Sequence, residues 1–247
     1  MTKTAIVTGG GRGIGRGCAH ELARQGCDIV LVDLIPEDLA ATKAEIEALG
    51  QGCRTYLADV ADFARAHQVV AEVEGETGPV DVLVNNAGKS NAEGITEITE
   101  ASFDRTIAIN LKGAFNWTHA VAPGMMKAEA GRIVMMSSLN AHTGGVTSAV
   151  SKFSYTTAKA GLLGMTRALA KEMAPHVLVN AVCPGVIETE RSNDMIRARK
   201  DELVRGISLG RTGTPADVAQ VVAFLCLSDP CFVTGQDIKI DGLQWVS

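Results

Sequence analysis

The feature that most constrains the fold of this chain is a series of short apolar runs that alternate with longer amphipathic stretches. Several of the runs are continuous in Val, Ile and Leu, as is typical of strands buried on both faces of a parallel sheet. The predicted strands are Thr4–Thr8, Ile29–Asp33, Thr55–Leu57, Val80–Asn85, Arg132–Met136, Leu178–Cys183 and Asp237–Ile240. The predicted helices are Ile14–Gln25, Glu37–Leu49, Asp62–Glu74, Ala101–Met126, Tyr155–Met173 and Ala216–Leu227. This order predicts an α/β protein with a doubly wound, mainly parallel seven-stranded sheet and helices on both faces.

The sequence contains no linker and no internal repeat, so residues 1–247 are expected to form a single domain. Ligands of open α/β sheets bind beyond the carboxyl ends of the strands. The segment of about residues 188–208 is polar and charged and follows a predicted strand end. We therefore expect this segment to be a lid over a substrate.

The charge balance excludes some partners. The chain has 23 basic and 28 acidic residues, which gives a net charge of −5. It therefore lacks the excess of positive charge that binding to nucleic acid or to an anionic membrane requires. No apolar run approaches the roughly 20 residues that span a bilayer. The N-terminal residues do not resemble a signal peptide. The six cysteines form no C-x-x-C pair and none lies at metal-ligand spacing from a histidine, so we expect a cytoplasmic protein without a metal site.

A glycine-rich turn, Thr8-Gly-Gly-Gly-Arg-Gly-Ile-Gly15, joins the first predicted strand to the first predicted helix. Such a turn lets the backbone approach a pyrophosphate at a helix N-terminus, so it predicts a Rossmann-type dinucleotide-binding domain. Asp33 ends the next strand, where a carboxylate can accept hydrogen bonds from ribose hydroxyls and repel a 2′-phosphate. We therefore expect NAD, with NADP less likely. Arg12 favours NADP instead, because a basic residue in this turn could reach the 2′-phosphate.

Several motifs from Thr8 to Gly242 resemble those of the short-chain dehydrogenase/reductase family, and they occur in the family's order. The glycine turn is similar to T-G-x-x-x-G-x-G, and Asn85-Asn-Ala-Gly88 matches N-N-A-G. Tyr155-Thr-Thr-Ala-Lys159 resembles Y-x-x-x-K, and Pro184-Gly-Val-Ile-Glu-Thr189 resembles P-G-x-[IV]-x-T. The resemblance implies reversible hydride transfer between nicotinamide and a secondary alcohol or ketone. The cofactor-binding residues that it implies are Gly9, Gly11, Arg12, Gly13, Ile14, Gly15, Asp33, Asp59, Val60, Asn86, Ala87, Gly88, Tyr155, Lys159, Pro184, Gly185, Ile187 and Thr189.

The same resemblance implies four catalytic residues, Asn110, Ser138, Tyr155 and Lys159, with Ser137 as a competitor for the role of Ser138. Tyr155 and Lys159 are four apart in a helical pattern, so they share a helix face. A tyrosine pKa is near 10, and a neighbouring ammonium is expected to lower it. Tyr155 could then exchange a proton with the substrate oxygen that Ser138 holds, while Asn110 organises a water beside Lys159.

Sixteen residues lie between Ser138 and Tyr155, more than is usual in the family. Within this loop Asn140 and His142 are candidate substrate contacts, although His142 could equally be solvated. Aromatic residues make up only 4% of the chain, which favours a small polar alcohol or ketone. The alternatives are a 3-oxoacyl-carrier-protein reductase that uses NADPH and a non-catalytic dinucleotide-binding regulator. Family members commonly form tetramers through the two long helices, so we expect a homotetramer.

Overall fold

The computed structural model describes residues 2–145, 151–190 and 199–246, and its strands form one sheet. The order is β3-β2-β1-β4-β5-β6-β7, and every neighbouring pair is parallel. The strands are β1 (Thr4–Thr8), β2 (Asp28–Asp33), β3 (Cys53–Leu57), β4 (Val82–Asn85), β5 (Gly131–Met136), β6 (Val177–Pro184) and β7 (Asp237–Ile240). The predicted fold class is confirmed, and the strand bounds differ from the predicted ones by at most two residues.

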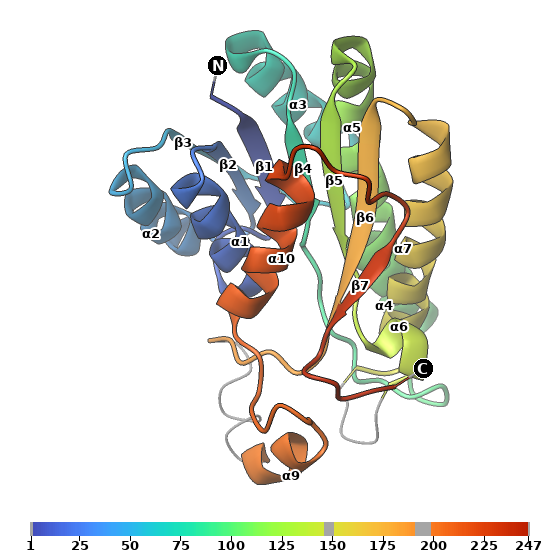
Figure 1. Cartoon of the computed structure of the whole chain (residues 1–247). Coiled ribbons are helices and arrows are strands. Elements are labelled where there is room, and N and C mark those ends of the chain that lie inside the picture. The colour runs from blue at the N-terminus through green and yellow to red at the C-terminus, as the bar shows by residue number, and fades with distance from the viewer. Residues whose placement is uncertain (1, 146–150, 191–198, 247) are drawn as a thin grey trace.

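Helices cover both faces of this sheet (Figure 1). The longer helices are α1 (Gly13–Arg24), α2 (Pro36–Glu47), α3 (Phe63–Thr77), α4 (Glu100–Ile107), α5 (Gly113–Ala128), α7 (Phe153–Glu172) and α10 (Pro215–Leu227). Side chains of α3, α5 and α7 pack into one apolar cluster, whereas those of α1, α2 and α10 pack into a second cluster on the opposite face. Among the described helices, none combines the length and apolar character that a membrane crossing requires. The cytoplasmic location stays a prediction.

The structure corrects one helix prediction and adds two short helices. The expected continuous helix Ala101–Met126 is divided into α4 and α5 by a π-helical turn, η1 (Ala108–Lys112). Two short helices, α6 (Asn140–Thr143) and α9 (Lys200–Arg205), were not predicted. Helices of four and six residues are too short to show a 3.6-residue periodicity.

The order of the strands fixes where a ligand can bind. The chain runs from β1 through β2 to β3 on one side and then crosses back, so that β4 pairs with the other side of β1. This reversal is the topological switch point, where a crevice opens beyond the carboxyl ends of the strands. The glycine turn after β1 and the Asn-Asn-Ala-Gly segment after β4 meet at this crevice.

Candidate active site

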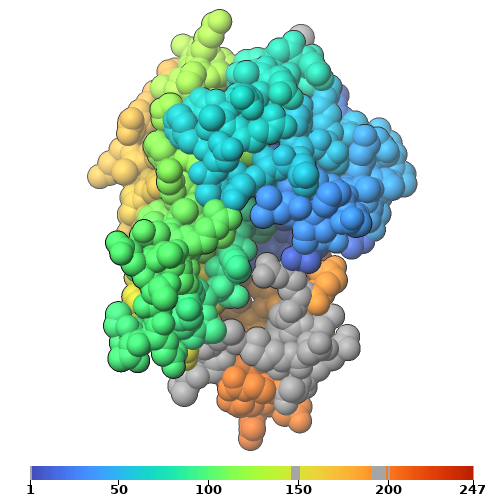
Figure 2. All heavy atoms as spheres, turned by 180° about the vertical axis from the view of Figure 1, so that it is seen from behind, coloured from blue at the N-terminus to red at the C-terminus, as the bar shows by residue number. Residues whose placement is uncertain are grey.

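A cavity of about 820 Å³ lies at the switch point. In the view from behind, the surface is hollowed between the blue N-terminal segments and the green segment of the chain (Figure 2). The predicted site residues that line the cavity are Gly9, Arg12, Gly13, Ile14, Asp33, Asp59, Val60, Asn86, Ala87, Gly88, Ser138, Asn140, Tyr155, Lys159, Pro184, Gly185, Ile187 and Thr189. Motifs spread from the first strand to the sixth are thus brought to one space. Gly11, Gly15, Asn110 and His142 are not among the lining residues.

The glycine turn makes close contacts that a side chain would prevent. A Cβ at Gly15 would lie 2.0 Å from the carbonyl oxygen of Gly9 and 2.5 Å from Nδ2 of Asn86. Gly13 has φ +56°, a left-handed conformation that favours glycine. Gly15 therefore shapes the cradle by letting α1 pack against the turn.

The start of α1 is suited to an anionic ligand. Its N-cap residue, Arg12, makes no side-chain capping hydrogen bond, and the first turn carries no acidic residue. The first N–H groups of a helix have no partner within the helix, and they attract phosphate. Because Gly13 and Ile14 line the cavity at this end, the residues present fit the pyrophosphate of a dinucleotide.

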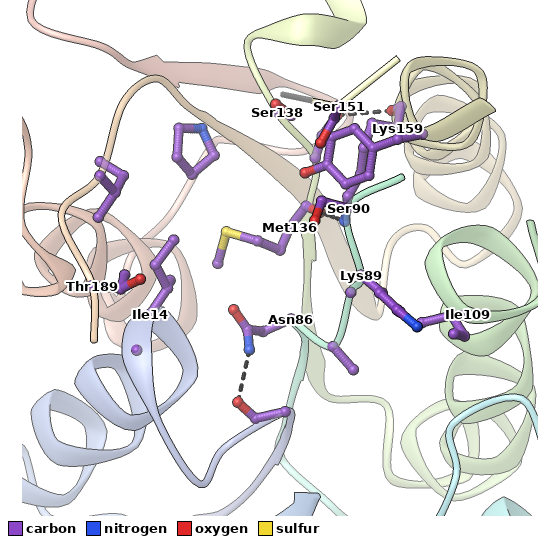
Figure 3. Close-up of a pocket in the computed structure, with 18 of the residues that line it drawn as sticks. Ile14, Asn86, Lys89, Ser90, Ile109, Met136, Ser138, Ser151, Lys159 and Thr189 are labelled. Carbon is purple, nitrogen blue, oxygen red and sulfur yellow. Dashed lines mark hydrogen bonds between the residues drawn. The ribbon is translucent and has the colours of Figure 1, made fainter. Parts of the chain in front are cut away.

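The segment after β4 is tied to the glycine turn by side-chain hydrogen bonds. Oγ1 of Thr8 accepts from the N–H groups of Asn86 (3.0 Å) and Ala87 (3.1 Å), and Nδ2 of Asn86 donates to the carbonyl oxygen of Gly9 (3.0 Å). These bonds fix the floor of the cavity between β1 and β4. Figure 3 shows Asn86 between Ile14 and the residues around Ser90.

Asn110 reaches the site through the backbone of Lys89. Its Nδ2 donates to the carbonyl oxygen of Lys89 (2.9 Å), and its Oδ1 accepts from the Lys89 N–H (3.1 Å). A Cβ at Gly88 would lie 2.9 Å from this Oδ1 and 3.3 Å from Nζ of Lys159. Gly88 thus allows Asn110 and Lys159 to approach each other, although Asn110 itself is buried behind the cavity wall.

Ser138, Tyr155 and Lys159 form one constellation at the cavity wall. The side chain of Ser138 lies near the Tyr155 hydroxyl and acts on its pKa, and Nζ of Lys159 lies 5.5 Å from the centroid of the Tyr155 ring. The same Nζ donates to the carbonyl oxygen of Met136 (2.7 Å). Figure 3 places Ser138, Met136 and Lys159 on one side of the cavity, opposite Ile14 and Thr189. Ser137 instead donates to the carbonyl oxygen of Lys159 (2.8 Å), so the structure favours Ser138 over Ser137 for the catalytic role.

Burial controls the ionisation of this constellation. Burial raises the pKa of Tyr155, and the nearby Ser138 hydroxyl offsets only part of that increase. Burial also lowers the pKa of Lys159 to about 8. The lowered pKa that was expected for Tyr155 is therefore not found in the ligand-free protein, because desolvation outweighs the effect of the Lys159 ammonium, which donates to Met136.

Three charged side chains surround the far end of the glycine turn. Oδ2 of Asp33 accepts from the Gly11 N–H (3.1 Å), which holds this carboxylate against the turn. The Arg12 guanidinium pairs with Asp38, with Nη1 3.5 Å from Oδ2. Arg12 is thus directed toward a carboxylate of α2 that sequence analysis did not single out.

Asp59 lies beyond β3 and pairs with a base of α4. Oδ1 accepts from the Ala61 N–H (2.9 Å) and Oδ2 accepts from Nη2 of Arg105 (2.6 Å). Burial opposes ionisation, but these two bonds hold the pKa of Asp59 below its usual value. The ionised carboxylate therefore forms a fixed edge of the cavity.

Of the two candidate substrate contacts, Asn140 and His142, only Asn140 lines the cavity. Asn140 lines the cavity, and its N–H donates to Oγ of Ser138 (3.2 Å). The expectation for His142 is corrected, because its imidazole turns away from the cavity: Nε2 lies 2.8 Å from Oδ2 of Asp237. Of the expected lid at 188–208, Arg199 and Leu203 line the cavity, and residues 191–198 lie outside the described part.

Several lining residues were not expected from the sequence. They include Leu34, Ile35, Met136 and Gln244. Leu34 and Ile35 directly follow β2, so their place beyond a strand end was an available signal. Gln244 had no such signal, because it reaches the cavity only through the course of the chain after β7.

This fold and site define a dinucleotide-binding oxidoreductase, and comparison with known proteins identifies the family. Residues 9–242 match the family profile described as enoyl-(acyl carrier protein) reductase. The chain belongs to the short-chain dehydrogenase/reductase family, is an oxidoreductase acting on CH–OH groups, and takes a nicotinamide dinucleotide as cofactor.

Similar proteins cover nearly the whole chain. It is 37% identical over 241 residues to the 3-oxoacyl-[acyl-carrier-protein] reductase FabG of Thermotoga maritima, covering 97% of this chain and 96% of that protein. It is 38% identical over 251 residues to the acetoacetyl-CoA reductase of Shinella zoogloeoides, covering 99% of each. A solved structure, ElxO with NADP bound, has a TM-score of 0.89 at 28% identity and covers 99% of each chain.

Two adjacent serines provide a matched test of the site. Ser138→Ala should lower kcat about a hundredfold, because the donor to the reacting oxygen is lost. Ser137→Ala should lower the free energy of unfolding by about 1 kcal/mol through the lost bond to Lys159, with a much smaller loss of kcat. Steady-state kinetics and urea unfolding of both variants would show which serine has the catalytic role. A larger loss of kcat in Ser137→Ala than in Ser138→Ala would assign that role to Ser137.

Proposed function

We propose that this protein transfers hydride reversibly between a nicotinamide cofactor, preferably NAD, and a small polar secondary alcohol or ketone. One observation carries the proposal. Ser138, Tyr155 and Lys159 line the same cavity as the glycine turn and the start of α1. A proton donor and a dinucleotide cradle therefore face one space, as hydride transfer to a carbonyl requires.

The roles of the residues follow from their contacts. The cofactor, when bound, supplies or accepts the hydride. In the direction of reduction the Tyr155 hydroxyl gives its proton to the ketone oxygen, and in oxidation it takes the alcohol proton. Ser138 orients the same oxygen. Lys159, whose pKa is lowered by burial to about 8, can exchange protons near neutral pH beside the Tyr155 ring. The water that Asn110 is expected to organise stays a prediction.

The lining of the cavity supports a hydroxylated substrate. Ser90, Asn140 and Ser151 place polar groups around the cavity. Gln244 also lines the cavity and adds an amide group to this polar lining. Arg199 and Leu203 support the proposal that residues 188–208 cover the substrate.

A second candidate is reduction of 3-oxoacyl thioesters with NADPH. The names of two relatives favour it, a 3-oxoacyl-[acyl-carrier-protein] reductase and an acetoacetyl-CoA reductase. A panel of polyols, hydroxy acids and small secondary alcohols, assayed beside acetoacetyl-CoA with each cofactor, separates the two. Turnover confined to acetoacetyl-CoA and NADPH would replace our proposal by this one.

The proposed preference for NAD depends on the charged side chains at the place where the ribose of the adenosine is expected to bind. Asp33 lines the cavity with its carboxylate, and Arg12, the cation that could neutralise a 2′-phosphate, pairs with Asp38. Two like charges about 4 Å apart repel by roughly 4 kcal/mol at an effective dielectric of 20, and about 1.4 kcal/mol is already tenfold in binding. NADP bound to ElxO is the evidence for the opposite preference.

The ratio of kcat/KM for NAD and NADP tests this proposal. The wild type should prefer NAD by at least about tenfold. Asp33→Ala should narrow or reverse the ratio, and adding Arg12→Ala should then mostly impair use of NADP. Asp28→Ala is the matched control, because Asp28 begins the same strand and contacts Gly52 instead of the cavity. A wild-type preference for NADP, or a ratio that Asp33→Ala does not move, would refute the preference.

The proton-transfer role is tested at Tyr155. Tyr155→Phe should bind the dinucleotide almost normally and lose at least about a hundredfold in kcat, because the exchangeable proton is gone. Lys159→Ala should also lose activity and should shift the pH optimum of oxidation upward, since the phenolate loses a nearby cation. The measurements are dinucleotide titration and pH–rate profiles. Near-normal turnover in Tyr155→Phe is incompatible with this role.

We also propose a homotetramer that assembles through α5 and α7. On α5, Phe115 and Met126 are exposed, and on α7 the small residues Gly164 and Ala168 are exposed, which permits close helix approach. A Cβ at Gly164 would meet nothing within 4 Å, so Gly164→Arg should dissociate the assembly without unfolding the subunit. Analytical ultracentrifugation at micromolar concentration should show a tetramer for the wild type. A monomeric wild type would contradict the proposal.

A further inference from the structure

Three side chains with metal-binding atoms meet beside the catalytic constellation. Nε2 of His142 lies 2.8 Å from Oδ2 of Asp237 and 3.8 Å from Sγ of Cys183. One ligand atom from each of the three residues lies within 4.8 Å of the other two. The sequence predicted no metal site, because these residues are far apart in the chain.

The fold explains how they converge. Ala181 pairs with Asp237 and Cys183 pairs with Lys239 in the parallel register of β6 and β7. Alternate residues of a strand share a face, so Cys183 and Asp237 lie on the same side of the sheet. His142 comes from α6, which the figure shows beside β7 (Figure 1). The Leu139 N–H donates to the carbonyl oxygen of Pro184 (2.9 Å), which anchors the start of this segment to the end of β6.

The donor set is that of a zinc site. Thiolate sulfur, imidazole nitrogen and carboxylate oxygen are the usual ligands of Zn²⁺, whereas Mg²⁺ and Ca²⁺ take oxygen ligands. Tetrahedral coordination at ordinary bond lengths separates nitrogen from sulfur by about 3.5 Å. The observed separation of 3.8 Å between Nε2 and Sγ is close to this value, whereas the 2.8 Å between Nε2 and Oδ2 is that of an ion pair, so the Asp237 carboxylate has to move outward by about half an ångström when a cation enters. A thiolate and a carboxylate together also balance the charge of a divalent cation.

We propose that His142, Cys183 and Asp237 bind one thiophilic divalent cation, such as Zn²⁺, with water completing a four-coordinate site. On binding, the metal–sulfur bond replaces the thiol S–H bond and the proton leaves to solvent. This cation is separate from the hydride-transfer chemistry, so the proposal does not depend on the proposed function.

Neighbouring groups support the positions of the ligands. Oδ1 of Asp237 accepts from Nη2 of Arg167 (2.9 Å), which leaves Oδ2 toward His142. The His142 ring stacks on Trp245 with 5.7 Å between centroids, and Nζ of Lys239 lies 4.8 Å from the centroid of the Trp245 ring. Outer partners of this kind orient ligands, while the two cationic groups weaken the affinity for a cation. The site therefore fits an exchangeable cation.

Cobalt spectroscopy tests the site directly. Metal-stripped protein titrated with Co²⁺ should develop a thiolate-to-cobalt charge-transfer band that saturates at one equivalent. Zn²⁺ should abolish the band by displacement, and Mg²⁺ should leave it unchanged. Cys183→Ser should lack the band, and Cys231→Ser, which removes the partly exposed cysteine, should retain it. Circular dichroism and dinucleotide binding show that each variant is folded.

Two further variants test the site independently in case Cys183→Ser does not fold. His142→Gln and Asp237→Asn each keep the thiol, so they should retain the band and bind Co²⁺ at least about tenfold more weakly. The proposal is overturned if wild-type protein gives no band at one equivalent. It is equally overturned if the band persists in folded Cys183→Ser, or if the affinity is unchanged in both His142→Gln and Asp237→Asn; in those cases His142 and Asp237 serve only as an ion pair.

Discussion

The active site depends on how closely the backbone after β1 and the backbone after β4 approach each other. Gly15 permits this approach at the glycine turn, where a Cβ would lie 2.0 Å from the Gly9 carbonyl oxygen. Thr8 and Asn86 then hold the two segments together by hydrogen bonds. The same close packing continues at Gly88, which leaves room for Asn110 and Lys159. One set of backbone contacts thus shapes both the glycine turn at the cavity and the position of the Lys159 ammonium.

Desolvation, more than charge pairing, shifts the ionisation of Tyr155 and Lys159 in the ligand-free protein. Burial raises the pKa of Tyr155 and lowers that of Lys159 to about 8, so each group is shifted toward its neutral form. A tyrosine that keeps its proton is ready to reduce a ketone. Oxidation of an alcohol requires the phenolate, which the positive ring of an oxidised nicotinamide favours.

The sequence predicted the elements whose signal is local. Short strand-like runs, several of them continuously apolar, predicted the seven strands, and the glycine turn predicted one wall of the cavity. Buried strands and tight turns leave direct marks on the local sequence. The direction of a side chain is not local. His142 was a candidate substrate contact or a solvated residue, yet it pairs with Asp237 on β7, and Gln244 reaches the cavity from the last segment of the chain. The predicted direction of the pKa shift of Tyr155 was wrong for the same reason. Burial of a side chain depends on residues from the whole folded site and cannot be judged from the local sequence.

The most direct test of the account is the ionisation of Tyr155 itself. The chain has only two tyrosines, Tyr56 and Tyr155, so in Tyr56→Phe the Cζ resonance of ¹³C-labelled tyrosine reports on Tyr155 alone. Its chemical shift, followed against pH, gives the pKa with and without oxidised dinucleotide. The account predicts a pKa above the ordinary value of about 10 in the free protein and a clear fall when the oxidised cofactor binds. A pKa that is already low in the free protein, or that the cofactor does not change, would contradict it.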